Sequence, residues 1–152
     1  MSDTAGGPDI RVQRARIEEV RELAEEYRAE QSAASADGHP SDVPMPQGGI
    51  FWIAKDGDGA TLGYAAGTMR PIGCQIGPVF TRGHARRRGV GEALLTAIQT
   101  WAEATRVPVV EISVAAGNSG GQAFLESLGY VPRRVLMSLT PGEAATPSTS
   151  EW

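Results

Sequence analysis

Residues 79–95 (VFTRGHARRRGVGEALL) constrain the fold more than any other stretch of this chain. A β-branched and aromatic run changes there to an arginine-rich turn, then to Gly-Val-Gly, and then to apolar residues at helical spacing. A helix that begins at Gly89 leaves its first four backbone N–H groups without acceptors, and its dipole adds about half a positive charge at that end. The stretch therefore predicts a strand-to-helix connection that can bind an anion.

The residue types in this connection favour a diphosphate as the anion. Gly89 and Gly91 lack side chains at positions where a ligand would otherwise meet Cβ atoms. Charged donors are supplied by three consecutive arginines: Arg86, Arg87 and Arg88. The alternative is structural, with glycines that only permit a turn of positive φ and arginines that are solvated at the end of a helix.

Two common nucleotide-binding motifs do not fit this stretch. Leu94 stands where G-x-G-x-x-G requires its third glycine, and the stretch follows a late strand rather than the first one. The chain also lacks G-x-x-x-x-G-K-[ST]. The net charge of −4 and the apolar face of the following helix argue against nucleic acid as the main partner.

Composition and length predict one globular domain. The 152 residues are 41% apolar and 21% charged, with neither a long apolar run nor a signal-peptide pattern, so we expect a cytoplasmic protein. We expect loose termini over residues 1–9 and 141–152, and a folded domain over residues 10–140. The single cysteine, Cys74, lies in an apolar run and is interpreted as a buried thiol, and the two distant histidines predict no metal centre.

Hydrophobic periodicity predicts an alternation of strands and helices. The expected helices begin near residues 17, 91 and 122, and the expected strands cover residues 10–16, 49–56, 62–70, 74–81, 107–115 and 130–140. Pro78 predicts either a bulge or an unpaired amide position in the fourth strand. Between residues 29 and 49 lies a long connection, often functional, with Asp37, His39 and Asp42. The order is typical of an α+β (mixed α/β) fold with helices on both faces of a sheet.

Two motifs resemble those of the GCN5-related N-acetyltransferase (GNAT) family. The family's acetyl-CoA signature, [QR]-x-x-G-x-[GA], is similar to Arg86-Arg87-Arg88-Gly89-Val90-Gly91. Its later pattern, N-x4-A-x4-L-G-[FY], is matched by Asn118, Ala123, Leu128, Gly129 and Tyr130. With the order of strands and helices, the resemblance covers residues 10–140. It implies a central, mostly antiparallel sheet that splays between its fourth and fifth strands, with helices on both faces.

The resemblance also implies which residues hold acetyl-CoA. The pantetheine arm would pair with the backbone of the fourth strand at Val79, Phe80 and Thr81. One of these amides, which we assign to Thr81, would polarise the thioester carbonyl. The diphosphate would be held by the stretch Arg86, Arg87, Arg88, Gly89, Val90 and Gly91, while Asn118 and Leu125 would line the pantetheine arm from the other side.

In this family a primary amine attacks the thioester directly, without an acyl-enzyme. The resemblance thus implies an N-acetyltransferase whose acceptor is a small molecule or a protein amine. It requires no cysteine nucleophile and no nucleic-acid or membrane partner, and it is compatible with a homodimer.

The expected acid and base positions depart from the family pattern. Leu125 stands where many members carry a tyrosine as general acid, and Tyr130 is interpreted as a packing residue instead. In the fifth predicted strand, Glu111 is a candidate base, with a solvated or structural carboxylate as the alternative, and Ser113 is a candidate polar group near the thioester. These departures leave a second hypothesis open, that of a non-catalytic acyl-CoA-binding module.

Overall fold

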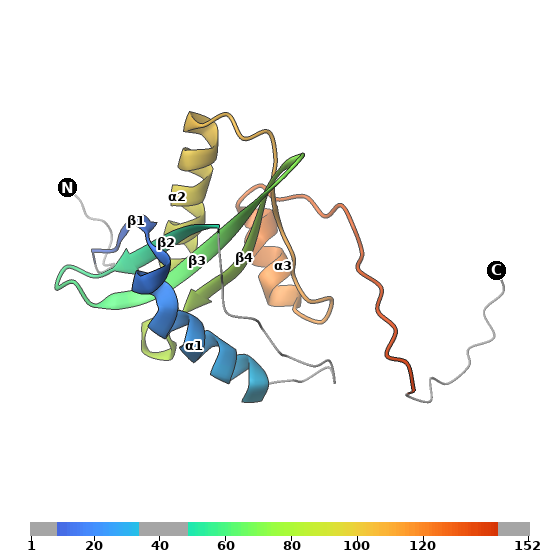
Figure 1. Ribbon diagram of the computed structural model, residues 1–152, viewed down its shortest axis with the longest axis horizontal. Coiled ribbons are helices and arrows are strands. Elements are labelled where there is room, and N and C mark those ends of the chain that lie inside the picture. The colour runs from blue at the N-terminus through green and yellow to red at the C-terminus, as the bar shows by residue number, and fades with distance from the viewer. Residues whose placement is uncertain (1–8, 34–48, 143–152) are drawn as a thin grey trace. The chain divides into compact units, whose positions relative to one another are not determined.

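The structure is a computed structural model that describes residues 9–33 and 49–142. The chain forms two compact units, Met1–Gly117 and Asn118–Trp152. The described part of the first unit contains one sheet and two long helices, and that of the second contains one short helix (Figure 1).

The first unit is built on a five-stranded sheet whose strands follow the chain order. Its strands are β1 (Arg11–Ala15), β2 (Ile50–Lys55), β3 (Thr61–Arg70), β4 (Gly73–Thr81) and β5 (Val110–Ile112). The pairs from β1 to β4 are antiparallel, and β5 is parallel to β4. This arrangement confirms the predicted mixed fold with a mostly antiparallel sheet.

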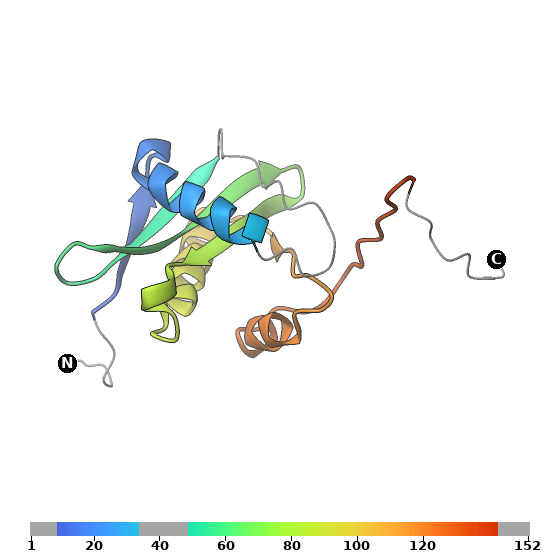
Figure 2. The same cartoon turned by 90° about the horizontal axis from the view of Figure 1, so that it is seen from below.

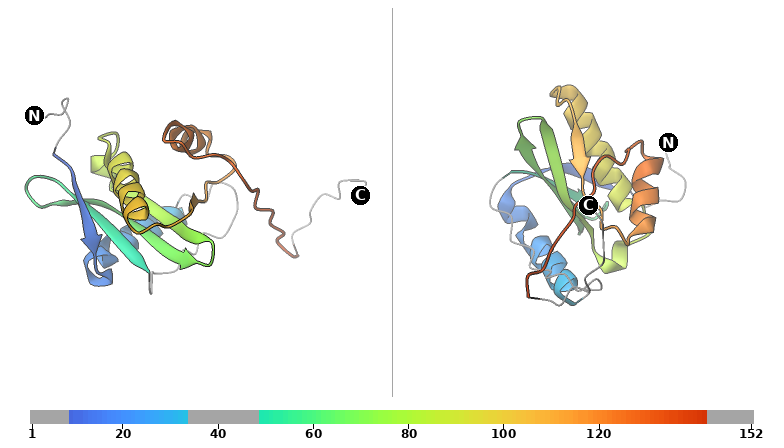
Figure 3. Two further views of the ribbon diagram at one scale, coloured as in Figure 1. Left: turned by 90° about the horizontal axis from the view of Figure 1, so that it is seen from above. Right: turned by 90° about the vertical axis from the view of Figure 1, so that its right-hand side faces the viewer.

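Two helices of the first unit cover opposite faces of the sheet (Figure 2, Figure 3). The helical segments of the chain are α1 (Ile17–Ala33), the short η1 (Gly83–Ala85), α2 (Val90–Ala104) and, in the second unit, α3 (Ser119–Ser127). Phe51 and Ile53 of β2 belong to the core cluster beneath α1. Trp52, between them, points to the other face and packs against Trp101 of α2, with 5.3 Å between ring centroids. No helix in the described part of the chain is long and apolar enough to cross a membrane.

The hairpin between β2 and β3 turns at the predicted Gly-Asp-Gly sequence. Asp56 closes the turn, because its Oδ1 accepts hydrogen bonds from the amides of Asp58, at 2.9 Å, and Ala60, at 3.0 Å. Gly59 has a φ of 86°, a left-handed conformation that favours glycine. The turn is thus fixed by local chemistry, which explains why the sequence pattern predicts it correctly.

A close approach of β3, β4 and α2 depends on Gly63. A Cβ atom at this position would lie 2.3 Å from the carbonyl oxygen of Phe80 and 3.2 Å from a methyl group of Val90. Glycine therefore lets β3 lie directly against the end of β4 and the beginning of α2.

The predicted bulge in β4 is confirmed. Gly77 and Pro78 together lie opposite a single residue of β3, Ala66. Such an extra residue bends its strand and interrupts the pairing. The bulge therefore separates the first half of β4 from residues 79–81.

The fifth strand is shorter than predicted. It covers Val110–Ile112, rather than residues 107–115, and its side chains are half-buried. The Val107 amide donates to the Ala102 carbonyl at the end of α2, at 2.9 Å, and cannot pair with a strand. Pro108 has no backbone N–H. The strand can therefore begin only after these residues.

In the second unit, α3 ends as predicted at Gly129. This glycine has a φ of 99°, and its amide donates to the Glu126 carbonyl at 3.0 Å. The Tyr130 amide donates to the Leu125 carbonyl, also at 3.0 Å. The two bonds form a Schellman motif, which satisfies carbonyl groups at the end of the helix.

The predicted last strand, residues 130–140, is wrong for this structure, which has no strand there. A strand needs a hydrogen-bonded neighbour, and these residues pair with no strand of the described chain. Large apolar side chains of this segment are consequently exposed: Val131, Val135, Leu136, Met137 and Leu139.

Candidate functional site

The fourth strand continues past its partner β5. Pairing between the two strands ends at Ile76 and Ile112, whereas residues 77–81 of β4 continue beyond that point. The last three of them pair with β3 on one side and with no strand of the described chain on the other. Because backbone groups of a strand point alternately to its two edges, part of this edge can pair with an extended ligand. The strands thus separate where the sequence resemblance predicts.

The connection from β4 leads into a helix start that no side chain caps. The first backbone hydrogen bond of α2 runs from the Ala93 amide to the Gly89 carbonyl, at 3.0 Å. The preceding amides of the first turn therefore have no acceptor within the helix. Gly89 is the N-cap residue and makes no side-chain capping bond. Its φ of 84° agrees with the alternative interpretation, in which this glycine only permits a turn of positive φ. The uncapped backbone amides of the first turn of α2 are nevertheless open to an anion.

The three arginines of this turn have different surroundings. The Nε of Arg86 donates to the Thr81 carbonyl at 3.1 Å, and its Nη2 pairs with Glu30 of α1 at 2.5 Å. Arg87 and Arg88 form no ion pair with any described residue. Of the three predicted phosphate ligands, these two thus have guanidinium groups without a competing carboxylate.

The sequence did not predict that Arg82, at the start of the same connection, forms ion pairs with α1. The side chain of Arg82 is 17% exposed and lies 3.5 Å from Glu22 and 3.3 Å from Glu26. Its Nη1 also donates to the Thr61 carbonyl at 3.3 Å. The signal in the sequence was the spacing of Glu22, Glu26 and Glu30, which places these residues on one face of a helix.

In the second unit, Asn118 caps α3. Its Oδ1 accepts a hydrogen bond from the Gly121 amide at 2.9 Å. Leu125 is the buried residue of this helix. Tyr130 is half-buried, and burial raises the pKa of its phenol. The contacts of Asn118 and Leu125 with a pantetheine arm remain predictions.

The candidate base lies at the end of β5. Glu111 is paired with Gln75, one residue before β4 and β5 separate. Cys74 and Ile76 point to the face of the sheet that α2 covers, so strand alternation places Glu111 on the face of α1. Ser113 follows β5 directly and is exposed. Both residues therefore lie beside the opening between the strands, and their catalytic roles remain predictions.

Cys74 is confirmed as a buried thiol. Its side chain is 2% exposed, and burial raises the pKa of the thiol. A raised pKa lowers the thiolate fraction near neutral pH, so Cys74 is a poor nucleophile. Among residues 9–33 and 49–142, no three His, Cys, Asp or Glu residues gather to hold a metal ion. Asp37, His39 and Asp42 lie outside the described residues.

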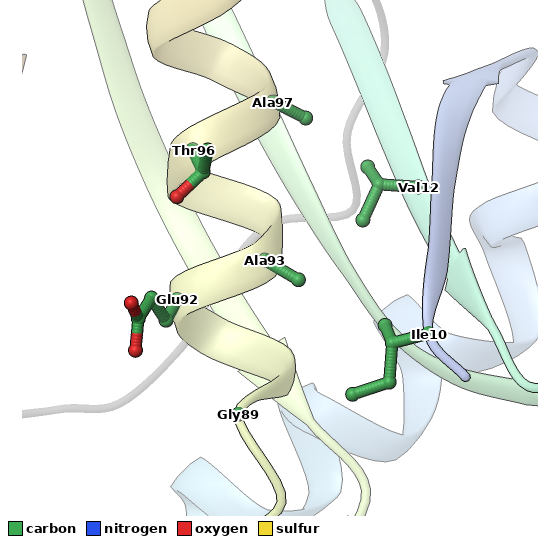
Figure 4. A pocket seen from close by; sticks show the side chains of 7 residues that line it. All are labelled: Ile10, Val12, Gly89, Glu92, Ala93, Thr96 and Ala97. Carbon is green, nitrogen blue, oxygen red and sulfur yellow. The ribbon is translucent and has the colours of Figure 1, made fainter. Parts of the chain in front are cut away.

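A pocket of about 600 Å³ lies between the β1 region and α2, and Gly89 at the start of α2 is one of its lining residues. In Figure 4, Ala93 and Ala97 of α2 face Ile10 and Val12. The remaining lining residues are Glu92 and Thr96. None of them belongs to β4, so the strand edge and the helix start define the candidate site better than this pocket does.

Comparison with known proteins points to one family. The model of the acetyltransferase (GNAT) family matches residues 17–130. A putative acetyl transferase from Pyrococcus furiosus has a similar structure, with 18% identity, a TM-score of 0.66 and coverage of 87% of this chain and 99% of that chain. No curated protein matches the chain in sequence.

Two other solved structures share the fold. An integron cassette protein from the mobile metagenome of V. cholerae is 20% identical, with a TM-score of 0.62 and coverage of 90% of this chain and 95% of that chain. AAC(6')-Iy, solved in complex with the bisubstrate analog CoA-S-monomethyl-acetylneamine, is 19% identical, with a TM-score of 0.58 and coverage of 86% of this chain and 97% of that chain. The matched residues include the separated strands. They also include the glycine-rich turn and α3, which carry the two sequence motifs. The chain therefore belongs to the acetyltransferase (GNAT) family.

Proposed function

We propose that the chain is an N-acetyltransferase that transfers the acetyl group of acetyl-CoA directly to a primary amine. The observation that carries the proposal is the continuous path from the unpaired edge of residues 77–81 to the uncapped start of α2. An extended amide chain can pair with the strand edge, and a diphosphate can bind at the helix start. CoA has these two groups in this order, and membership of the GNAT family supports acetyl-CoA as the acyl donor.

The backbone of β4 would orient the thioester. An amide of Val79, Phe80 or Thr81 that points to the open edge would donate to the carbonyl oxygen, where negative charge develops during attack. One well-placed donor of this kind contributes about 3–4 kcal/mol to stabilising the transition state. The Arg86 side chain holds the Thr81 carbonyl at 3.1 Å, which fixes the end of this strand.

The reaction makes modest demands on acid and base groups. The amine nitrogen forms a bond to the carbonyl carbon, the carbon–sulfur bond breaks, and the amine loses a proton. A thiolate with a pKa of about 8.5 leaves readily near neutral pH. Orientation of the two reactants can supply up to about 7–11 kcal/mol, which exceeds the effect of a single proton donor. Glu111 is our candidate for accepting the amine proton, directly or through water, and Ser113 for a polar group near the thioester.

For the acceptor we propose only a class, that of cationic primary amines. The net charge of −4 favours long-range attraction of a cationic amine, on either a small molecule or a protein. A screen of primary amines that detects free CoA released from acetyl-CoA is the direct test of the proposal.

One observation favours a second candidate function, a non-catalytic acyl-CoA-binding module. Leu125 occupies the position where many members of the family carry a tyrosine as general acid. Its side chain is buried and has no proton to donate. If no amine releases CoA while calorimetry shows that CoA binds, the binding module becomes the better description.

The substitution Leu125→Tyr separates the two candidates. We expect turnover by the native chain and at most a modest gain in kcat for Leu125→Tyr, because the departing thiolate needs little protonation. The measurement is CoA release with an amine found in the screen. Phe124→Tyr, which adds the same hydroxyl to the preceding residue of α3, is the matched control. A native chain that is silent but becomes active as Leu125→Tyr would show that catalysis has been lost.

Salt should weaken the binding of CoA. Arg87 and Arg88 have no ion pair with described residues, so their attraction to phosphate is open to screening. The screening length falls from about 10 Å at 0.1 M salt to about 3 Å at 1 M. Calorimetric titration with CoA should give a higher Kd at high salt, and replacing both arginines by glutamine should flatten this dependence. Arg70→Gln, at the far end of β3, should leave it unchanged, and a salt-independent Kd would exclude the arginines from binding.

A further inference from the structure

Two arginines and three glutamates form an ion-pair ladder between α1 and the connection from β4 to α2. The members of the ladder are Glu22, Glu26 and Glu30 on α1, and Arg82 and Arg86 on the connection. Arg82 directly precedes η1 and Arg86 directly follows it. Both ends of this short segment are therefore attached to the same helix.

Arg86 joins three parts of the molecule. Its Nη2 pairs with Glu30 at 2.5 Å, and its Nε donates to the Thr81 carbonyl at 3.1 Å. Its backbone continues directly into Arg87, which has a φ of 65°. A left-handed conformation is uncommon for a residue other than glycine and persists only where the surrounding structure holds it. The side-chain bonds of Arg86 hold one side of Arg87, and the start of α2 holds the other.

We propose that Glu30 is a positioning residue for acyl-CoA: through Arg86, it holds residues 87–91 in the conformation that receives the diphosphate. This inference rests on the proposed function and adds to it a residue of α1 that lies outside both family motifs. Glu30 itself does not contact the ligand. It acts by keeping the amides at the start of α2 in place before the ligand arrives, which lowers the entropic cost of binding.

The solvent exposure of the Arg86–Glu30 ion pair indicates that it positions the turn rather than stabilises the whole fold. The side chains of Arg86 and Glu30 are 51% and 41% exposed, and an ion pair open to solvent contributes little to global stability. A carboxylate near a diphosphate would by itself repel it. Removing the charge of Glu30 therefore has opposite effects under the two descriptions: CoA binds more weakly if Glu30 positions the turn, and more tightly if Glu30 only repels the ligand.

The test is the Kd of CoA for the native chain and for Glu30→Gln, measured by calorimetry. We expect CoA binding to weaken about 3- to 10-fold in Glu30→Gln, which corresponds to about 0.7–1.4 kcal/mol. Without ligand, the backbone amides of residues 87–91 should exchange hydrogen faster in the variant. The midpoint of thermal unfolding should change little.

Two further variants make the test specific. Glu25→Gln changes the same charge on the same helix, at an exposed residue without an ion pair to any described residue, and should leave the Kd unchanged. In an Arg86→Gln background, Glu30→Gln should cause no additional loss, because the two residues act through one contact.

Several outcomes would overturn the proposal. These are unchanged or tighter CoA binding by Glu30→Gln, an equal loss in Glu25→Gln, and additive losses in the double variant. If the native chain binds CoA and Glu30→Gln binds it equally well, only the positioning role is wrong. If the native chain does not bind CoA at all, the proposed function is wrong, and the role of Glu30 with it.

Discussion

Gly91→Asp is expected to abolish CoA binding in a chain that remains folded. Gly91 lies in the first turn of α2, where the backbone amides have no acceptor within the helix. A carboxylate there interacts favourably with the helix dipole, by about 0.3–1 kcal/mol, so the helix should not be destabilised. The same carboxylate occupies the place of the diphosphate and repels it. We expect calorimetry to show a Kd at least about 100-fold higher, equivalent to about 2.7 kcal/mol.

Two variants control for bulk and charge. Gly91→Ala adds only a methyl group and should weaken binding less than aspartate does. Gly57→Asp adds the same charge in the turn between β2 and β3, where a Cβ would meet nothing within 4 Å, and should not change the Kd. Unchanged CoA affinity in Gly91→Asp would mean that the diphosphate does not bind at the start of α2.

Gly63→Ala is expected to destabilise the fold and the site together. The new Cβ would lie 2.3 Å from the Phe80 carbonyl oxygen, a backbone atom that no rotamer change can move. β3 and β4 must therefore separate at this point, at a cost of about 2–3 kcal/mol, as for an overpacked core. Urea denaturation should show the lower free energy of unfolding. CoA binding at a temperature where the variant is folded should also weaken, because the end of β4 moves.

Gly57→Ala is the matched control for this second prediction, since it has open space around its Cβ. Its free energy of unfolding should stay within about 0.5 kcal/mol of the native value. An equally stable Gly63→Ala would show that the close approach of β4 to β3 is not required.

The features that the sequence predicts correctly are determined by neighbouring residues. The Gly-Asp-Gly turn is closed by the Asp56 side chain, and Gly129 ends α3 by its own left-handed backbone. Pro78 produces the bulge in β4 because it has no amide to pair with β3 or β5. Each of these effects acts over a few residues and is therefore visible in a short stretch of sequence.

The features that the sequence does not predict depend on segments far apart in the chain. Glu30 and Arg86 are 56 residues apart, and nothing in either local pattern pairs them. The prediction for residues 130–140 was wrong for a related reason. Their apolar and β-branched side chains are typical of a strand, but the sequence of this segment does not show whether a neighbouring strand is present for it to pair with. The predicted phosphate ligands have the same limit. The sequence does not distinguish Arg86, Arg87 and Arg88, whereas within residues 9–33 and 49–142 only Arg86 of the three has a carboxylate partner.

The bulge in β4 also limits how far a strand of another molecule could pair with the open edge of the sheet. An unpaired strand edge is a template for a strand of another molecule, and long, flat edges are the most prone to such pairing. Here the edge that remains open after the last pair with β5 begins with Gly77 and Pro78, which interrupt the ladder, so only residues 79–81 offer regular strand geometry. Three residues are at the short end of the usual strand length, so this edge offers a foreign strand few hydrogen bonds but can still guide a short, flexible ligand. The bulge thus shortens the stretch of this edge that a strand of another molecule could extend, while residues 79–81 stay open to a ligand.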